Sequence, residues 1–123
     1  MTRSATALMS LTSPEQTAVV TADFGPMLES GVTITAVALV SMTVWPNSSH
    51  PAQDPEAASR IIGPPEVVAS PKTGVANAAI AQKIGNLLEN VRYAIRIAGT
   101  ASDGTEPELW EYMTADYPGM PGS

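Results

Sequence analysis

Apolar and polar residues alternate along several short segments of the chain, and a period of two predicts β-strands. The longest of these segments covers residues 32–45, where every second residue from Val32 to Val44 is apolar and the intervening residues are mixed. We therefore expect a strand with one buried face and one partly exposed face. A fully extended strand of this length would span about 46 Å, so a bend or a bulge is expected within it.

Shorter segments with a similar pattern lie on both sides of the long strand. Residues 15–24 are rich in β-branched side chains, and residues 91–101 alternate cleanly. The Ser-Asp-Gly sequence at 102–104 supplies the turn that a hairpin needs, and a last strand is expected at 108–114. Residues 75–84 fit a strand face and a helix stripe almost equally, but the glycine and asparagine that follow favour a strand. On the strand at 15–24, Ala18, Val20, Ala22 and Phe24 are expected to share one face. On the strand at 91–101, the residues expected to face inward are Val91, Tyr93, Ile95, Ile97 and Ala101.

The segment at 46–74 contains six of the eleven prolines, which prevents long regular structure there. Two short strands are expected within it, near residues 60–62 and 66–70. The rest of the segment is expected to be a loop, and a long loop in a small domain is usually either mobile or a contact surface.

About seven short strands without a strong helix predict an all-β fold in which two antiparallel sheets form a sandwich. Tyr93 lies six residues after Leu87 and begins an alternating strand. This arrangement is typical of the tyrosine corner of immunoglobulin-like and fibronectin-like domains, in which the tyrosine hydroxyl bonds to the backbone just upstream. The alternative is a core tyrosine whose hydroxyl lies at the rim. We therefore expect an immunoglobulin-like antiparallel β-sandwich of about seven strands.

The expected strands suggest one domain with an extended arm at each end. The sandwich is expected to cover residues 15–114 and to include the Pro-rich loop at 46–74. Residues 1–14 are small and polar and are expected to form an N-terminal arm, and residues 115–123 are expected to form a C-terminal tail. Much of the apolar content is alanine, which buries little area per residue, so the core should be thin and the domain should depend on neighbours for stability.

Charge and cysteine content narrow the possible partners and compartments. The formal net charge is −6 and the six basic residues are scattered singly, so no patch is expected to bind nucleic acid. The chain has no cysteine, which removes disulfides and thiolate sites and favours folding in a reducing cytoplasm. The apolar run at 7–9 is too short for a signal peptide, and no window approaches the length of a membrane span.

Two groups of residues could in principle form a catalytic or metal-binding site. His50, the single histidine, lies in the same loop as Ser48, Ser49 and Asp54, but a Pro-rich loop does not fix the geometry of a catalytic triad. A solvated loop histidine is therefore expected.

The second group consists of Asp103, Glu106 and Glu108, which lack the spacing of a calcium-binding loop, so a solvated hairpin is expected there. We therefore expect no catalytic residue, no metal site and no cofactor, and we expect that the protein is not an enzyme.

Exposed aromatic residues and methionine suggest where a partner protein would bind. Trp45 ends the long strand just before Pro46, and Tyr117 and Met120 lie in the Gly-Pro tail. These three are the interface candidates, although Trp45 would fit equally well as a cap on the edge of the core. Trp110 is expected to face the core.

Two separated segments resemble a group of small tailed-bacteriophage proteins that are described as fibre–tail adaptor or neck proteins with an immunoglobulin-like fold. The first segment, "LESGVTITAVALVSMTVW", matches a strand pattern of that group, and the second, "IAQKIGNLLENVRYAIRIAGTASDG", matches a later strand and turn. The matching residues are Gly31, Thr33, Thr35, Val37, Tyr93, Ile95, Ser102, Asp103 and Gly104. The likeness covers about residues 16–114, and the chain departs from the group's pattern in its Pro-rich segment at 46–74 and in the "GNLLEN" turn before Tyr93.

This resemblance implies a structural protein of the virion that is made in the host cytoplasm. It would form a homo-oligomeric ring and would bind portal-proximal, tail or fibre subunits, without nucleic acid, membrane, catalysis or cofactor. Three alternatives stay open: a capsid decoration protein of the same fold, a stand-alone adhesive module, and a small hydrolase that uses His50.

Overall fold

The structure is a computed structural model that describes residues 2–10, 17–48, 50–88 and 90–116. Within these residues the chain is almost entirely strands and loops, with two short 3₁₀ turns. The strands are β1 (Thr2–Ser10), β2 (Thr17–Asp23), β3 (Ile34–Val44), β4 (Glu66–Val68), β5 (Ala79–Gly85), β6 (Arg92–Ala101) and β7 (Glu108–Asp116), and the turns are η1 (Gly25–Met27) and η2 (Ala57–Arg60).

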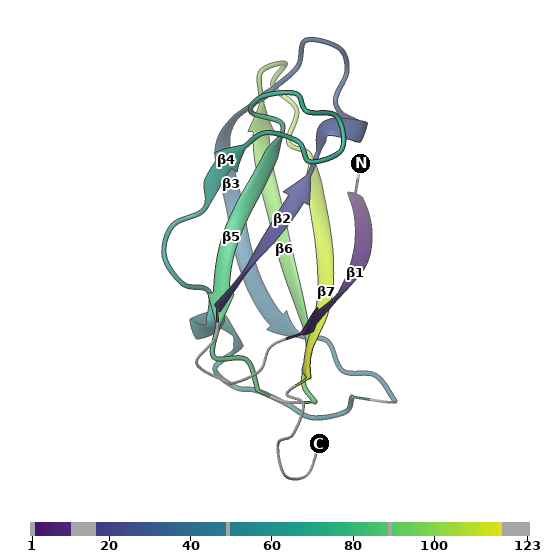
Figure 1. The fold of residues 1–123 in the computed structure, drawn as a ribbon, viewed down its shortest axis with the longest axis vertical. Coiled ribbons are helices and arrows are strands. Elements are labelled where there is room, and N and C mark those ends of the chain that lie inside the picture. Colours follow the sequence, from purple (N-terminus) through teal and green to yellow (C-terminus); the bar gives the residue numbers. More distant parts are fainter. Residues whose placement is uncertain (1, 11–16, 49, 89, 117–123) are drawn as a thin grey trace.

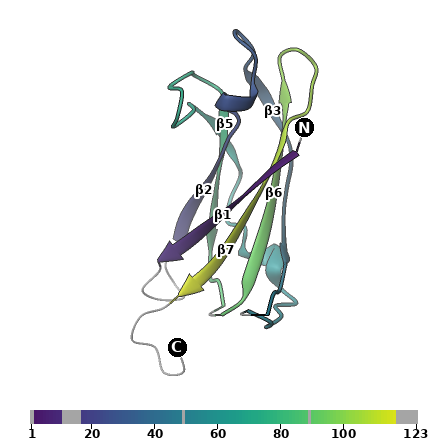
Figure 2. The ribbon, with the colours of Figure 1, turned by 90° about the vertical axis from the view of Figure 1, so that its right-hand side faces the viewer.

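The strands form two sheets that face each other across one core (Figures 1 and 2). One sheet has the order β1-β7-β6-β3 and the other has the order β2-β5-β4. All strand pairs are antiparallel except β1 with β7, which is parallel. The prediction of an all-β fold built on two antiparallel sheets is therefore confirmed.

Both sheets contribute their inward faces to the core, as the alternating pattern predicted. The residues expected to share one face at 15–24 and those expected to face inward at 91–101 are buried or pack against the core. Residues 79–85 form the strand β5, which the sequence favoured over a helix. The fully buried large side chains of the described residues include Phe24, Ile80, Ile84, Leu87, Tyr93, Ile95, Ile97 and Met113.

The long strand β3 contains two bulges, which confirms the predicted irregularity and corrects the predicted faces. Its pairing with β6 shifts once between Ile34 and Ala36 and again between Val37 and Leu39. Each shift moves the alternation by one residue. Val37 consequently packs against the core, whereas Ala36 and Ala38, which the simple alternation placed inside, are exposed. The original alternation resumes at Val40, Met42 and Val44, which pack on the core as expected.

The ends and the Pro-rich segment differ from the expectation in detail. Residues 2–10, which lie in the segment expected as an extended N-terminal arm, form the edge strand β1, whose pairing uses backbone groups that leave little trace in the side-chain pattern. In the Pro-rich segment, β4 is found within 66–70 as expected. Near 60–62 the structure has η2 followed by a single bridge from Ile61 to Ile84 instead of a strand.

Candidate functional site

Three aromatic and two arginine side chains gather on the outer face of the four-stranded sheet, and this group is called the aromatic–arginine patch. It contains Trp45, Arg92, Arg96, Trp110 and Tyr112. Alternation along β6 and β7 explains the gathering, because residues 92 and 96 share one face of β6 and residues 110 and 112 share the same face of β7. Trp45 joins them because it follows β3 directly, and its N–H donates to the carbonyl oxygen of Arg92 at 2.8 Å.

The rings and guanidinium groups of the patch contact one another in one layer, with the rings tilted rather than stacked. The Trp45 ring lies with its centroid 6.2 Å from that of Trp110 and 6.3 Å from that of Tyr112, tilted by 53° and 54°. The Arg92 guanidinium lies 4.5 Å from the Tyr112 centroid, and that of Arg96 lies 5.8 Å from the Trp110 centroid. These are cation–π distances, so each arginine interacts with the face of one aromatic ring of the patch.

The polar ends of the layer are also bonded. Arg96 Nη2 donates to Glu108 Oε2 at 2.6 Å, and Trp110 Nε1 donates to Glu108 Oε1 at 3.0 Å. The hydrogen bond from Arg96 lowers the pKa of Glu108, so this carboxylate stays charged. Arg92 Nη1 donates to the carbonyl oxygen of Trp45 at 3.0 Å.

Ala94 shows how closely the layer covers the sheet. Its neighbours Tyr93 and Ile95 face the core, so Ala94 faces outward, and yet it has no exposed surface. Its strand partners are Tyr112 and Thr43. The patch therefore shields the sheet from water while it leaves Trp45 51% exposed. Trp45 therefore keeps half of its surface open to solvent on the outer face of the sheet.

The predicted orientation of Trp110 is wrong. It was expected to face the core, but the inward positions of β7 are held by Leu109 and Met113, which are buried. Trp110 alternates with them and therefore lies in the patch. The other two interface candidates, Tyr117 and Met120, lie outside the described residues.

Tyr93 makes the bond that the tyrosine-corner prediction requires. The Leu88 N–H donates to the Tyr93 hydroxyl at 2.9 Å, one residue after the buried Leu87. The hydroxyl in turn donates to Asp54 Oδ2 at 2.7 Å. Burial, the largest of the influences on this phenol, raises the pKa of Tyr93 far above its ordinary value. The hydroxyl therefore stays protonated and joins two distant segments of the chain.

Asp54 and Arg60 were missed as a pair by the sequence interpretation. Asp54 is only 5% exposed, and Arg60 binds both of its oxygens, with Nε at 2.9 Å and Nη2 at 3.1 Å. The bonds from Arg60 outweigh burial and lower the pKa of Asp54. This network fixes the Pro-rich loop to the start of β6. The sequence signal for this ion pair is the spacing of six residues between Asp54 and Arg60, across the short turn η2 that ends at Arg60.

The residues weighed as a triad with His50 are engaged elsewhere or lie outside the description. The Asp54 carboxylate is occupied by Arg60, Tyr93 and the N–H of Glu56. The His50 N–H donates to Asn47 Oδ1 at 2.7 Å, within the loop. Ser48 is exposed and Ser49 lies outside the described residues. No triad geometry is found among the described members.

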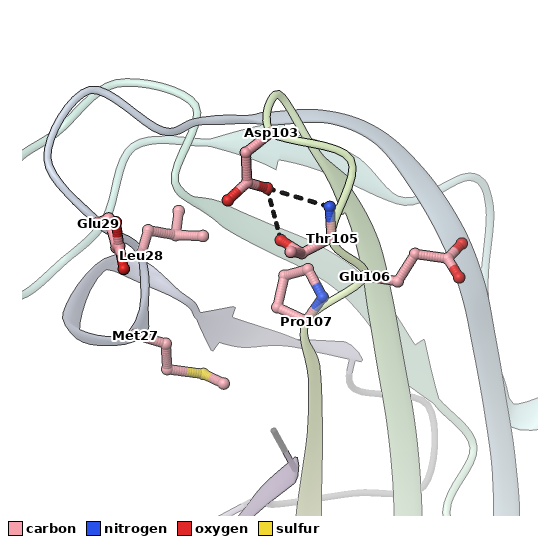
Figure 3. A pocket seen from close by; sticks show the side chains of 7 residues that line it. All are labelled: Met27, Leu28, Glu29, Asp103, Thr105, Glu106 and Pro107. Carbon is pink, nitrogen blue, oxygen red and sulfur yellow. Dashed lines mark hydrogen bonds between the residues drawn. The ribbon is translucent and has the colours of Figure 1, made fainter.

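A cavity of about 250 Å³ lies between η1 and the β6–β7 turn, at the end of the sandwich where β1 begins (Figures 1 and 3). Its lining is Met27, Leu28, Glu29, Asp103, Thr105, Glu106 and Pro107. Asp103 Oδ1 accepts bonds from the Thr105 N–H at 3.0 Å and from its hydroxyl at 2.6 Å, so its first role is to shape the turn. Glu108, weighed with Asp103 and Glu106 as a calcium ligand, is bound to Arg96 instead.

No group of three or more acidic or histidine side chains in the described part of the chain is placed to hold a metal ion. Within the same residues, no helix is both long enough and apolar enough to cross a membrane. Comparison of the chain with models of protein families, with curated proteins and with solved structures gave no match.

Proposed function

We propose that this chain is an immunoglobulin-like, non-catalytic structural protein of a tailed-bacteriophage virion, acting as a connector or fibre-attachment component at the neck or tail. The strand order supports the fold assignment. The order β3-β6-β7 in one sheet and β2-β5-β4 in the other is that of the C-F-G and B-E-D strands of immunoglobulin domains. The hydrogen bond from the Leu88 N–H to the Tyr93 hydroxyl near the start of β6 supports the same assignment, since immunoglobulin-like domains have a tyrosine corner near the start of strand F.

The observation that carries the connector proposal is the aromatic–arginine patch. The chain has only six aromatic residues, two Trp, three Tyr and one Phe, and three of them lie in the patch on the outside of the sheet. Phe24 and Tyr93 are the aromatic residues buried in the described core. Tryptophan, tyrosine and arginine are the residues that contribute most to protein–protein binding, so the aromatic surface serves a neighbouring subunit at the expense of the core.

The charge of the chain supports a protein partner over a nucleic acid. The net charge is −6, and in the patch the charge of Arg96 is neutralised by Glu108. A face with tilted aromatic rings in contact and an Arg96–Glu108 ion pair suits a desolvated protein contact. The sequence resemblance to phage adaptor proteins adds the virion as the assembly, with a homo-oligomeric ring and portal-proximal, tail or fibre subunits as neighbours.

The test is co-purification with the virion proteins encoded beside this gene. The tagged chain is expressed with the portal, tail and fibre subunits, and the captured subunits are identified. The chain should capture at least one of them, and Trp45→Ala should reduce the capture at least ten-fold. Val19→Ala is the matched control, because Val19 is 60% exposed on the other sheet. Capture of no virion subunit by the unmodified chain would contradict the proposal.

A further inference from the structure

We propose that the edge of β7 is an acceptor site for a β-strand of a second copy of this chain, and that residues 2–10 are the strand exchanged. The proposal names the partner and the surface for the multi-copy assembly proposed above, and it rests on that assembly. It uses a different surface from the aromatic–arginine patch, so the two can fail separately.

The composition of β7 is that of an edge strand. Its inward positions are Leu109, Glu111 and Met113, because Leu109 and Met113 are buried and Glu111 alternates with them. A charge that points inward is one of the features by which edge strands avoid wrong pairing. The neighbouring strand β6 carries no charge on the corresponding face, which holds Tyr93, Ile95 and Ile97. β7 therefore carries the inward-pointing charge that is typical of an edge strand, although β1 pairs with it.

Glu111 has no hydrogen bond or ion pair within the described part of the chain, and burial raises its pKa to about 7. Its position on β7 is paired with Ala5 of β1. A partly buried carboxylate beside β1 is a cost of docking this strand, because burial disfavours its charged form. The cost is relieved when β1 leaves, so β1 is held less firmly than the other strands.

The position of β1 in the topology allows it to leave without disturbing another strand. It is the end strand of its sheet and pairs with β7 alone, in a parallel ladder of residues 2–10 with residues 108–116. The pairs β7-β6-β3 and β2-β5-β4 do not depend on it. The same ladder forms whether β1 comes from the same chain or from another copy, which is why strand exchange is a low-cost route to assembly.

The absence of cysteine from the chain makes a direct test possible. Leu8 of β1 pairs with Thr114 of β7. One full-length chain carries Leu8→Cys with a long tag, and a second carries Thr114→Cys with a short tag. The two are expressed together, purified and oxidised, and the products are separated by size without reductant. The control pair is Leu8→Cys with Thr43→Cys, because Thr43 is exposed on β3 and pairs with Ala94.

The expected product carries both tags and forms at least ten-fold more than the product of the control pair. A chain that carries both Leu8→Cys and Thr114→Cys reports the competing arrangement. If this double variant closes within one chain and the mixed pair gives no more product than the control, the exchange is overturned. If neither closes, β1 does not lie on β7 in solution and the proposal is also overturned.

A Glu111→Gln variant tests the role given to the inward charge. Two separately purified cysteine chains are mixed, and the time course of cross-linking gives the exchange rate. Glu111→Gln should slow this exchange several-fold, since the neutral amide removes the charge that disfavours docking. Equal rates would overturn the acceptor-edge argument. Trp45→Ala should leave the cross-link unchanged, so loss of virion partners in that variant would be distinguishable from loss of strand exchange.

Discussion

At the scale of single residues, Tyr93 joins more of the molecule than any pattern in the sequence indicates. Its hydroxyl accepts from the Leu88 N–H and donates to Asp54, which is itself held by Arg60. The spacing of six residues between Leu87 and Tyr93 in the sequence predicted a hydrogen bond between the Tyr93 hydroxyl and the backbone just upstream. Asp54 was not predictable, because it comes from a Pro-rich loop and reaches Tyr93 only through the tertiary fold.

Tyr93→Phe should lower the free energy of unfolding by about 1–3 kcal/mol, because it removes one of the hydrogen bonds to the buried Asp54 carboxylate and leaves the Leu88 N–H without the hydroxyl to which it donates. Urea unfolding of the variant and the unmodified chain measures the difference. Tyr112→Phe is the control, since the Tyr112 hydroxyl makes no hydrogen bond in the described part of the chain, and its effect should stay below about 0.5 kcal/mol. Equal effects of the two variants would contradict the network.

Glu111 should make the stability of the chain depend on pH. Burial raises its pKa to about 7 in the folded chain, from an ordinary value of 4.5. The folded state therefore binds the proton more tightly than the unfolded state, and the protein loses stability as the pH rises from about 4.5 to about 7. Glu111→Gln removes this loss.

Urea midpoints at about pH 4, 6 and 8 measure the effect of Glu111. The variant and the unmodified chain should agree at pH 4, and the variant should be the more stable at pH 8. Acidic groups whose pKa is lowered, such as Asp54 and Glu108, act in the opposite direction at low pH in both proteins and cancel from the comparison. A difference that is the same at all three pH values would show that Glu111 is not buried as described.

At the scale of the elements, the strands that alternate simply were predictable and the bulged strand was predictable only in part. The sequence of β6 places its inward residues correctly because the strand is regular and is paired on both sides. In β3 the sequence showed that the strand was too long to be regular, but it did not show where the bulges lie. That information depends on the register with β6, in which Val37 and not Ala36 or Ala38 turns inward.

Two substitutions in β3 test this register. Ala38→Glu should change the free energy of unfolding by less than about 0.5 kcal/mol, because Ala38 is exposed. Val37→Glu should lower it by about 1–3 kcal/mol, because it places a charge against the core. Urea unfolding of the pair gives the comparison directly. A larger effect at Ala38 than at Val37 would mean that the uninterrupted alternation is correct.

At the scale of the whole molecule, the chain combines a small core with an aromatic outer surface. The aromatic–arginine patch was predictable only at Trp45, which stands next to a proline at the end of a strand. Trp110 was misplaced, because alternation in β7 gives two possible faces and the larger aromatic side chains suggested the wrong one. The inward face of β7 instead holds Leu109, Glu111 and Met113, a choice that depends on the register with β6.

The central claim is that the outer face of the four-stranded sheet is covered by a neighbouring subunit in the assembled particle. Hydroxyl-radical footprinting of Trp45, in the isolated chain and in purified virions, tests this most directly. Trp45 is 51% exposed in the chain alone, and it should lose most of its reactivity in the particle, while Val75, which is 48% exposed elsewhere, serves as a reference. Equal reactivity of Trp45 in the two samples, or absence of the chain from the particle, would contradict the account.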